Sequence, residues 1–287
     1  MVLDTTFLKQ LDRFELIMSR KINSPYQGER QSIAAGSGLV LKDFTHYSAG
    51  DDFRKIDWKV FARTDKLFIK RYEEERNLTV HILVDYSGSM NFGKRIKKSE
   101  YAAMLGLGFA YMAMKNNERF LLSTFAERID IFKPRRGRAQ LAAMVDYLSA
   151  KKSENITNFE ESLGQYYKGM VKNKSVIIII SDFLYPIEQI RTTLLRFRNH
   201  DVKLIQVLDE VELNLALEGD YKLVDSESKA QLRTFISPYL RKIYLGALND
   251  HNAKIKRLVS EIHGQFVTIG TNQELFDAFY NVLGGRK

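Results

Sequence analysis

The fold of this chain is decided by one stretch of sequence, Thr79-Val-His-Ile-Leu-Val-Asp85-Tyr86-Ser87-Gly88-Ser89-Met90. Residues 78–84 are almost continuously apolar, which is typical of a strand that is buried on both faces of a sheet. Asp85 ends this strand, and the small polar residues that follow it are typical of a loop. The stretch therefore predicts a central buried strand with a carboxylate at its end.

The same pattern returns further along the chain. The most apolar run is Ser175–Ile180, and it leads into Ser181 and Asp182. Around these two runs we expect further strands at 119–125, 202–208 and 265–269 and helices at 100–115, 139–149, 159–172, 187–199 and 273–283. Apolar strands that alternate with helices predict an α/β fold, with a parallel-dominated sheet covered by helices on both faces.

The segment before this alternation has a different character. An amphipathic pattern predicts a helix over residues 3–21, and glycine-punctuated β-branched and aromatic runs predict a small β-rich region after it. Later in the chain, residues 210–226 are polar and turn-rich, and residues 228–263 have a helical pattern. The predicted organisation is a helix and β-rich region over 1–77 and an α/β domain over 78–287 with an insertion at about 210–263.

Composition excludes several classes of protein. The 287 residues are 45% hydrophobic, which suffices for a sizeable core and excludes general disorder. The absence of cysteine excludes disulfides, zinc–thiolate sites, iron–sulfur clusters and cysteine nucleophiles. Asp4 and Lys9 interrupt the N-terminus, and the longest apolar run is far shorter than the roughly 20 residues of a membrane helix. We therefore expect a cytoplasmic chain.

Asp85 and Asp182 are expected to lie close together, because the carboxyl ends of parallel strands meet at one edge of the sheet. Two carboxylates about 4 Å apart repel each other by roughly 4 kcal/mol at an effective dielectric constant of 20. A cation, a shared proton or a basic side chain must offset this repulsion. The spacing Asp85-x-Ser87-x-Ser89 favours a cation that prefers oxygen ligands, such as Mg²⁺, Mn²⁺ or Ca²⁺.

This spacing resembles the metal-ion-dependent adhesion site of von Willebrand factor A domains, and the chain from about residue 78 onward resembles that Rossmann-like fold. The resemblance implies that Thr157 and Asp182 complete a metal site with Asp85, Ser87 and Ser89. It also implies that some of these residues bind the metal through water, and that one position stays open for an acidic residue of a partner protein.

A second motif lies in the N-terminal part of the chain. Its residues are Tyr47, Gly50, Asp51, Asp52, Arg54, Asp57, Trp58 and Arg63. On residue types alone, Gly50-Asp51 predicts a turn, and the alternating charges suggest a partly buried ion-pair network. The string resembles the N-terminal motif of a bacterial family of unknown function, number fifty-eight in its series. That resemblance implies a divergent von Willebrand A domain that works as an adaptor beside a MoxR-type AAA+ ATPase.

Two other functions compete with this interpretation. Gly88-Ser-Met-Asn-Phe-Gly93-Lys94 matches the first seven positions of a P-loop, which would make the chain a nucleotide hydrolase using Lys94 and Asp182. Position 95, however, is Arg where a P-loop needs Ser or Thr to hold Mg²⁺.

The net charge of +9 instead suggests a scaffold that binds nucleic acid. Its densest basic cluster holds Arg135, Arg136 and Arg138, which could contact phosphate or an acidic protein. Few aromatic residues lie among these charges, which disfavours base stacking. The sequence thus favours a non-enzymatic, metal-dependent protein-interaction module with Mg²⁺ as its cofactor and an acidic protein as its ligand.

Overall fold

The computed structural model describes residues 39–48, 51–74, 79–93, 95–131, 137–151, 158–224 and 230–283. The chain divides into two compact units, and their described parts lie within residues 39–74 and 79–283. The helix predicted over residues 3–21 lies outside the described residues.

The smaller unit is built on a β-hairpin, which agrees with the small β-rich region that the sequence predicts. β1 (Leu39–His46) pairs antiparallel with β2 (Phe68–Glu74). Between these strands the chain forms a 3-10 turn, η1 (Phe53–Lys55), and a short helix, α2 (Trp58–Thr64). The helix was not expected, and it begins here because the side chain of Asp57 accepts hydrogen bonds from the backbone N–H groups of Lys59 and Val60.

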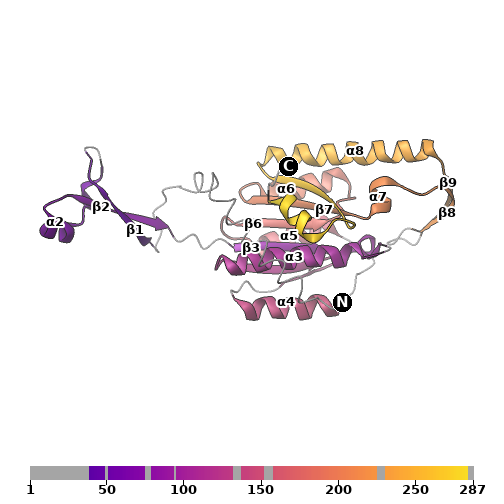
Figure 1. Ribbon diagram of the computed structural model, residues 1–287. Helices are drawn as coiled ribbons and strands as arrows, with labels where there is room; N and C mark the ends of the chain where they lie inside the picture. The colour runs from indigo at the N-terminus through magenta and orange to yellow at the C-terminus, as the bar shows by residue number, and fades with distance from the viewer. Residues whose placement is uncertain are drawn as a thin grey trace. The chain divides into compact units, whose positions relative to one another are not determined.

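The larger unit is centred on one six-stranded sheet (Figure 1). Its strands are β3 (Thr79–Asp85), β4 (Arg119–Phe125), β5 (Ile129–Asp130), β6 (Val176–Ser181), β7 (Asp201–Leu208) and β10 (Gln265–Gly270). Their order across the sheet is β10-β7-β6-β3-β4-β5, and every pairing is parallel except that between β4 and β5. This is the strand order of a Rossmann-like sheet. The predicted α/β fold with a parallel-dominated sheet is confirmed.

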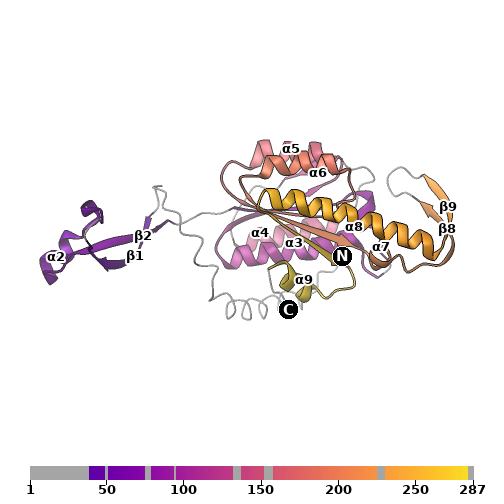
Figure 2. The same cartoon turned by 90° about the horizontal axis from the view of Figure 1, so that it is seen from above.

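Helices cover both faces of this sheet (Figure 2). α3 (Lys98–Lys115) packs with α4 (Arg138–Ala150) and α9 (Leu275–Val282) on one face. α5 (Phe159–Met170), α6 (Ile187–Phe197) and α8 (Pro238–Glu261) pack together on the other face. The chain thus leaves β3 toward one face and β6 toward the other. Since β3 and β6 are neighbours, the loops at their carboxyl ends diverge, and this divergence makes the crevice where such folds bind ligands.

The segment expected to be one long helix over 228–263 has a different structure at its start. β8 (Gly219–Val224) and β9 (Gln231–Ile236) form an antiparallel hairpin, and α8 begins only at Pro238. The side chain of Ser237 caps α8, and a proline suits the first position of a helix. The run Thr234-Phe235-Ile236 just before this cap consists of residue types that favour strands.

A glycine controls how closely α3 and α9 approach each other. A β-carbon added to Gly108 in α3 would lie 1.9 Å from the ring of Phe279 in α9, and Phe279 is fully buried. The ring has no room to move without disturbing the packing around it. The close contact between these helices therefore depends on the absence of a side chain at position 108.

We predict that Gly108→Ala lowers the free energy of unfolding by about 1–3 kcal/mol, because the methyl group overpacks a filled core. Urea unfolding measures this loss. Gly169→Ala in α5 is the matched control, because nothing lies within 4 Å of its added β-carbon. The control should be neutral or slightly stabilising, since alanine favours helix over glycine. Equal stability of the two variants would contradict the packing argument.

Candidate functional site

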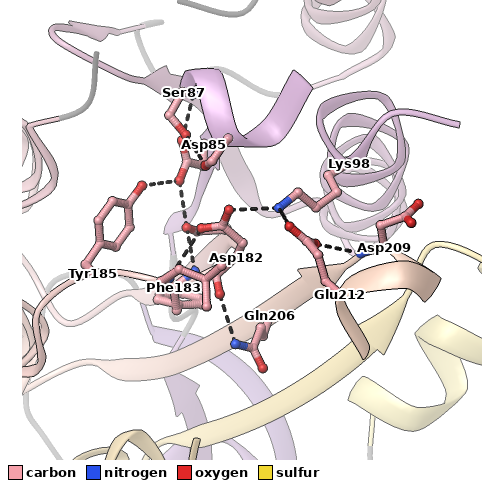
Figure 3. Close-up of polar contacts among 12 residues, drawn as sticks. Asp85, Ser87, Lys98, Asp182, Phe183, Tyr185, Gln206, Asp209 and Glu212 are labelled. Carbon is pink, nitrogen blue, oxygen red and sulfur yellow. Dashed lines mark hydrogen bonds and ion pairs between the residues drawn. The ribbon is translucent and has the colours of Figure 1, made fainter. Parts of the chain in front are cut away.

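Two aspartates meet in the crevice at the carboxyl ends of β3 and β6. Asp85 ends β3 and Asp182 follows β6, and the two side chains are 0% and 1% exposed. Figure 3 shows both carboxylates with the polar groups that surround them. The sequence-based expectation that the two strand ends bring these residues together agrees with their positions.

Asp85 is held on both of its carboxylate oxygens. Oδ1 accepts a hydrogen bond from the backbone N–H of Ser87 at 2.8 Å. Oδ2 accepts hydrogen bonds from the hydroxyl of Ser181 at 2.6 Å and from the hydroxyl of Tyr185. Burial, and then the nearby charge of Asp182, raise the pKa of Asp85 to about 6, although these hydrogen bonds work in the opposite direction.

The loop after β3 brings two hydroxyl groups together. Residues Gly88–Asn91 form a 3-10 turn, η2, and the hydroxyl oxygens of Ser87 and Ser89 lie 3.0 Å apart. Ser87 is fully buried, whereas Ser89 is partly exposed. The pair therefore lies beside Asp85, with one member accessible from solvent.

Asp182 has a cation of its own. The ammonium group of Lys98, in the first turn of α3, donates to Asp182 Oδ2 at 2.9 Å and to Glu212 Oε1 at 2.7 Å. The Lys98 side chain is 0% exposed, so this ammonium is completely shielded from water by the protein. Burial lowers the pKa of Lys98, but the two carboxylates outweigh it, and the net shift is upward.

Glu212 comes from the insertion, in the short helix α7 (Glu210–Asn214). Its other carboxylate oxygen accepts from the backbone N–H of Asp209, while the side chain of Asp209 caps the same helix. Burial raises the pKa of Glu212. Lys98 therefore links three parts of the domain: the start of α3, the end of β6 and the start of the insertion.

The turn after β6 directs Asp182 toward this lysine. Phe183 adopts a left-handed backbone conformation with φ of 51°, which is uncommon for a bulky residue. Its N–H donates to the hydroxyl of Ser181 at 3.0 Å, and its carbonyl oxygen accepts from Nε2 of His251 at 2.8 Å. These two hydrogen bonds hold the turn from both sides.

The sequence left open what offsets the repulsion between Asp85 and Asp182, and the structure provides two of the three possibilities. A basic side chain neutralises Asp182, and the raised pKa of Asp85 favours a bound proton. Lys98 escaped the sequence analysis because it lies in a run of basic residues that resembles a solvated surface. Lys98 lies three residues before Tyr101 and four before Ala102, which places it on the apolar side of α3. This helical spacing is the signal that its side chain is buried.

Comparison with known proteins identifies the family. The family model described as "Protein of unknown function DUF58" matches residues 43–254. The chain belongs to this family. The predicted family is thus confirmed. An uncharacterised protein of Mycobacterium tuberculosis is 25% identical to the DUF58 chain over 290 residues, which cover 99% of this chain and 91% of that protein.

Two solved structures are similar to the DUF58 chain in fold. The VWA domain of SpRpn10 has 12% identity and a TM-score of 0.45, covering 71% of this chain and 94% of that one. Proximal thread matrix protein 1 from the mussel byssus, whose structure has a zinc-occupied MIDAS motif, has 11% identity and a TM-score of 0.40, covering 72% of this chain and 47% of that one. Both structures resemble this chain in fold only.

The donor groups of the DUF58 chain can be tested against a divalent cation. Among the described residues, no group of three or more His, Cys, Asp or Glu side chains is arranged to hold a metal ion. The two hydroxyls, however, fit Mg²⁺: two ligands at right angles, each about 2.1 Å from the ion, lie about 3.0 Å apart. Ser87 Oγ and Ser89 Oγ form a hydrogen bond with each other at 3.0 Å, a spacing that two ligands of one Mg²⁺ could also have. The hydroxyl pair therefore fits the cation, while both carboxylates already have protein partners.

The other predicted site residues have different positions. Thr157, Arg135, Arg136 and Gly50 lie outside the described residues. Arg138 is exposed at the first position of α4. None of the helices among the described residues is long and apolar enough to cross a membrane.

In the N-terminal motif, the carboxylates bind backbone N–H groups. Asp51 accepts from the N–H of Ser48, and Asp52 accepts from that of Arg54. Asp57 is buried and caps α2.

The guanidinium of Arg63 donates to the carbonyl oxygen of Lys59. The backbone N–H of Tyr47 donates to the carbonyl oxygen of Leu67, and the ring of Trp58 is 59% exposed. The motif therefore shapes turns and leaves its tryptophan on the surface.

We predict that Lys98→Met lowers the free energy of unfolding by about 3–5 kcal/mol at pH 7, because it leaves the buried carboxylate of Asp182 and the partly buried carboxylate of Glu212 without their cation. Urea unfolding measures the loss, which should shrink at lower pH as Glu212, whose pKa burial raises, takes up a proton. Lys97→Met is the matched control, since Lys97 is exposed and its side chain makes no capping hydrogen bond. A Lys98 variant as stable as the Lys97 variant would disprove the structural role of the buried ammonium.

A second prediction concerns the pH dependence of stability. Folded Asp85 keeps its proton up to about pH 6, whereas the unfolded chain releases it near pH 3.8. The stabilisation from this proton is complete below about pH 4 and is lost as the pH rises through 6. In EDTA, the wild type should therefore lose about 2 kcal/mol relative to Asp85→Asn between pH 4 and pH 7.

Chemical denaturation of both proteins across this pH range measures the difference. Asp201→Asn is the control, because Asp201 is exposed at the start of β7. Its stability should run parallel to that of the wild type. A constant difference between wild type and Asp85→Asn over the whole range would mean that Asp85 is charged throughout.

Proposed function

We propose that the chain is a non-enzymatic protein-interaction module that binds its partner at the carboxyl ends of β3 and β6, through a divalent cation. Ser87, Ser89, Thr157, Asp85 and Asp182 would hold the cation. The observation that carries the proposal is the pair of hydroxyl oxygens of Ser87 and Ser89, 3.0 Å apart, in the crevice of an α/β sheet.

The surrounding residues prepare this hydroxyl pair. Asp85 accepts the N–H of Ser87, which fixes the loop so that both hydroxyls point to the same side. Ser181 and Tyr185 hold Asp85 in turn, so the loop does not depend on a cation for its shape. A bound Mg²⁺, Mn²⁺ or Ca²⁺ would supply a Lewis acid that attracts the carboxylate of an acidic partner residue.

The rim of the site suits a protein partner. Phe92 follows η2 and is 44% exposed, and Leu184 lies two residues after Asp182 and is 47% exposed. The backbone N–H of Leu184 donates to Asp182 Oδ1, so this apolar side chain lies directly beside the site. Exposed apolar side chains around a few polar groups are typical of a surface that binds another protein.

A nucleotide hydrolase is less well supported. A P-loop requires its helix to begin at the lysine of the motif, so that backbone N–H groups and the helix N-terminus hold the phosphates. Here η2 follows β3, and α3 begins at Lys98, whose ammonium is occupied by Asp182 and Glu212. Lys94 lies outside the described residues. No observation at the described residues favours nucleic acid as the ligand.

For the partner, we propose a MoxR-type AAA+ ATPase, with the chain acting in the cytoplasm as an adaptor that presents an acidic protein ligand during complex assembly or stress response. Membership of the DUF58 family and the resemblance of the N-terminal motif support this proposal. The net charge of +9 suits an acidic ligand, because opposite charges speed association.

The metal proposal predicts that Mg²⁺ raises the melting temperature of the wild type, since a ligand that binds only the folded state stabilises it by mass action. Ser89→Ala should abolish the shift while leaving the fold intact, because Ser89 is partly exposed and, among the described residues, its hydroxyl is hydrogen-bonded to that of Ser87 alone. Ser260→Ala on α8, which also removes one local hydrogen bond, is the matched control and should keep the shift.

The same variants test the function. A purified MoxR-type ATPase should bind the wild type and Ser260→Ala in Mg²⁺, and binding should fall in EDTA and for Ser89→Ala. Binding that is equal in Mg²⁺ and EDTA would overturn the metal dependence. An Mg²⁺-dependent melting shift without any binding would overturn the choice of partner and leave the metal site intact.

A further inference from the structure

A group of exposed apolar side chains lies on the insertion, on the elements that follow α7. We call it the hairpin patch, and its members are Leu223, Val224, Leu232, Phe235, Tyr239 and Ile243. They come from β8, β9 and the first two turns of α8, and their exposed fractions run from 42% for Leu223 to 74% for Tyr239. Figure 2 shows the hairpin at one end of α8, beyond the sheet. Several exposed large apolar side chains on one part of a domain often mark an interaction site.

The hairpin itself has little support among the described residues. β8 and β9 form a separate two-stranded sheet, and neither pairs with the six-stranded sheet. A two-stranded hairpin is marginally stable in water without cover. Each strand also keeps one edge whose backbone N–H and C=O groups are not paired with another described strand. Such an edge can accept a further strand from another chain.

The charges on the hairpin point to the chemistry of that strand. Lys222 of β8 lies directly opposite Arg233 of β9, and like charges in this position destabilise a hairpin. Neither cation forms an ion pair with a carboxylate in the described part of the chain, and both are exposed. One pair further along the same face, Asp220 lies opposite Phe235. This face thus combines the two cations with the exposed side chains of Phe235 and Val224, whereas the paired Leu223 and Leu232 lie on the other face of the hairpin.

The base of the hairpin is well anchored. Ile236 at the end of β9 is 2% exposed, and Arg241 in α8 donates to the carbonyl oxygen of Asn214 at the end of α7. α7 in turn carries Glu212, which binds the buried Lys98. The hairpin patch is therefore presented at a defined place on the domain while its apolar side chains remain uncovered.

We propose that the hairpin patch binds an extended, acidic segment of a partner protein, which adds as a third strand to the β8–β9 hairpin. Its carboxylates pair with Lys222 and Arg233, and its apolar side chains cover the exposed members of the patch. The open strand edges favour a polypeptide over an anionic membrane, because lipids offer no backbone groups to pair with them. This surface is separate from the cation site and requires no metal, so it goes beyond the proposed function.

The proposal is tested with the full chain and a fluorescent ten-residue probe peptide that alternates Glu with Val. A peptide with Gln in place of Glu and vesicles of phosphatidylglycerol serve as the other two probes. The acidic peptide should bind the wild type equally in Mg²⁺ and in EDTA. The double variant Lys222→Glu/Arg233→Glu should weaken this binding by about tenfold or more, because it replaces two attractive contacts by repulsive ones.

Two further variants keep the result interpretable. Leu232→Thr preserves the preference for a strand while removing apolar surface, and it should also weaken binding. The double variant Lys256→Glu/Arg257→Glu changes net charge by the same amount on an exposed part of α8 and should bind like the wild type. Circular dichroism and melting temperatures check that every variant folds.

Several outcomes would overturn the proposal. These are equal loss of binding in the Lys256/Arg257 variant, equal binding of the glutamine peptide, and no binding of the acidic peptide at millimolar concentration. Binding of the vesicles in place of the peptide would assign the patch to a membrane surface and would also overturn it. Because the peptide assay runs in EDTA, its result does not depend on whether the cation site functions as proposed.

Discussion

The buried ammonium of Lys98 is the interaction on which the arrangement of this domain depends. It lies between Asp182 and Glu212, and it brings together a helix start, a strand end and an insertion that are far apart in sequence. Removing charges from water is costly, so such a cluster persists only if each member finds its partners. Lys98 and its two carboxylates meet this condition, and the surrounding loops take their positions from it.

A second constraint comes from the sheet. Two neighbouring parallel strands that both end in aspartate force two carboxylates into one crevice, and the structure separates their environments. Asp182 faces an ammonium, whereas Asp85 faces hydroxyl and N–H groups that turn its oxygens toward the protein. The hydroxyls of Ser87 and Ser89 are what this arrangement leaves for an incoming ligand.

The main features of the fold could be predicted from the sequence because they depend on long apolar runs. Strands β3 and β6 are such runs, and their ends locate Asp85 and Asp182. Lys98 could not be recognised from its basic neighbours, because a charge cluster resembles a solvated surface until the helix face is known. The hairpin before α8 was missed because strand β9 is short and half-polar, and it runs directly into a long helical pattern. Thr157 remains a prediction.

The neutralisation of Asp182 by Lys98 affects how long a cation would stay bound at this site. Oxygen sites bind cations more tightly when more carboxylates contribute negative charge. Here the ammonium of Lys98 already neutralises the charge of Asp182. An ion at the serine hydroxyls would therefore be held loosely and would exchange quickly with solvent. A contact made through such an ion would form and dissociate repeatedly.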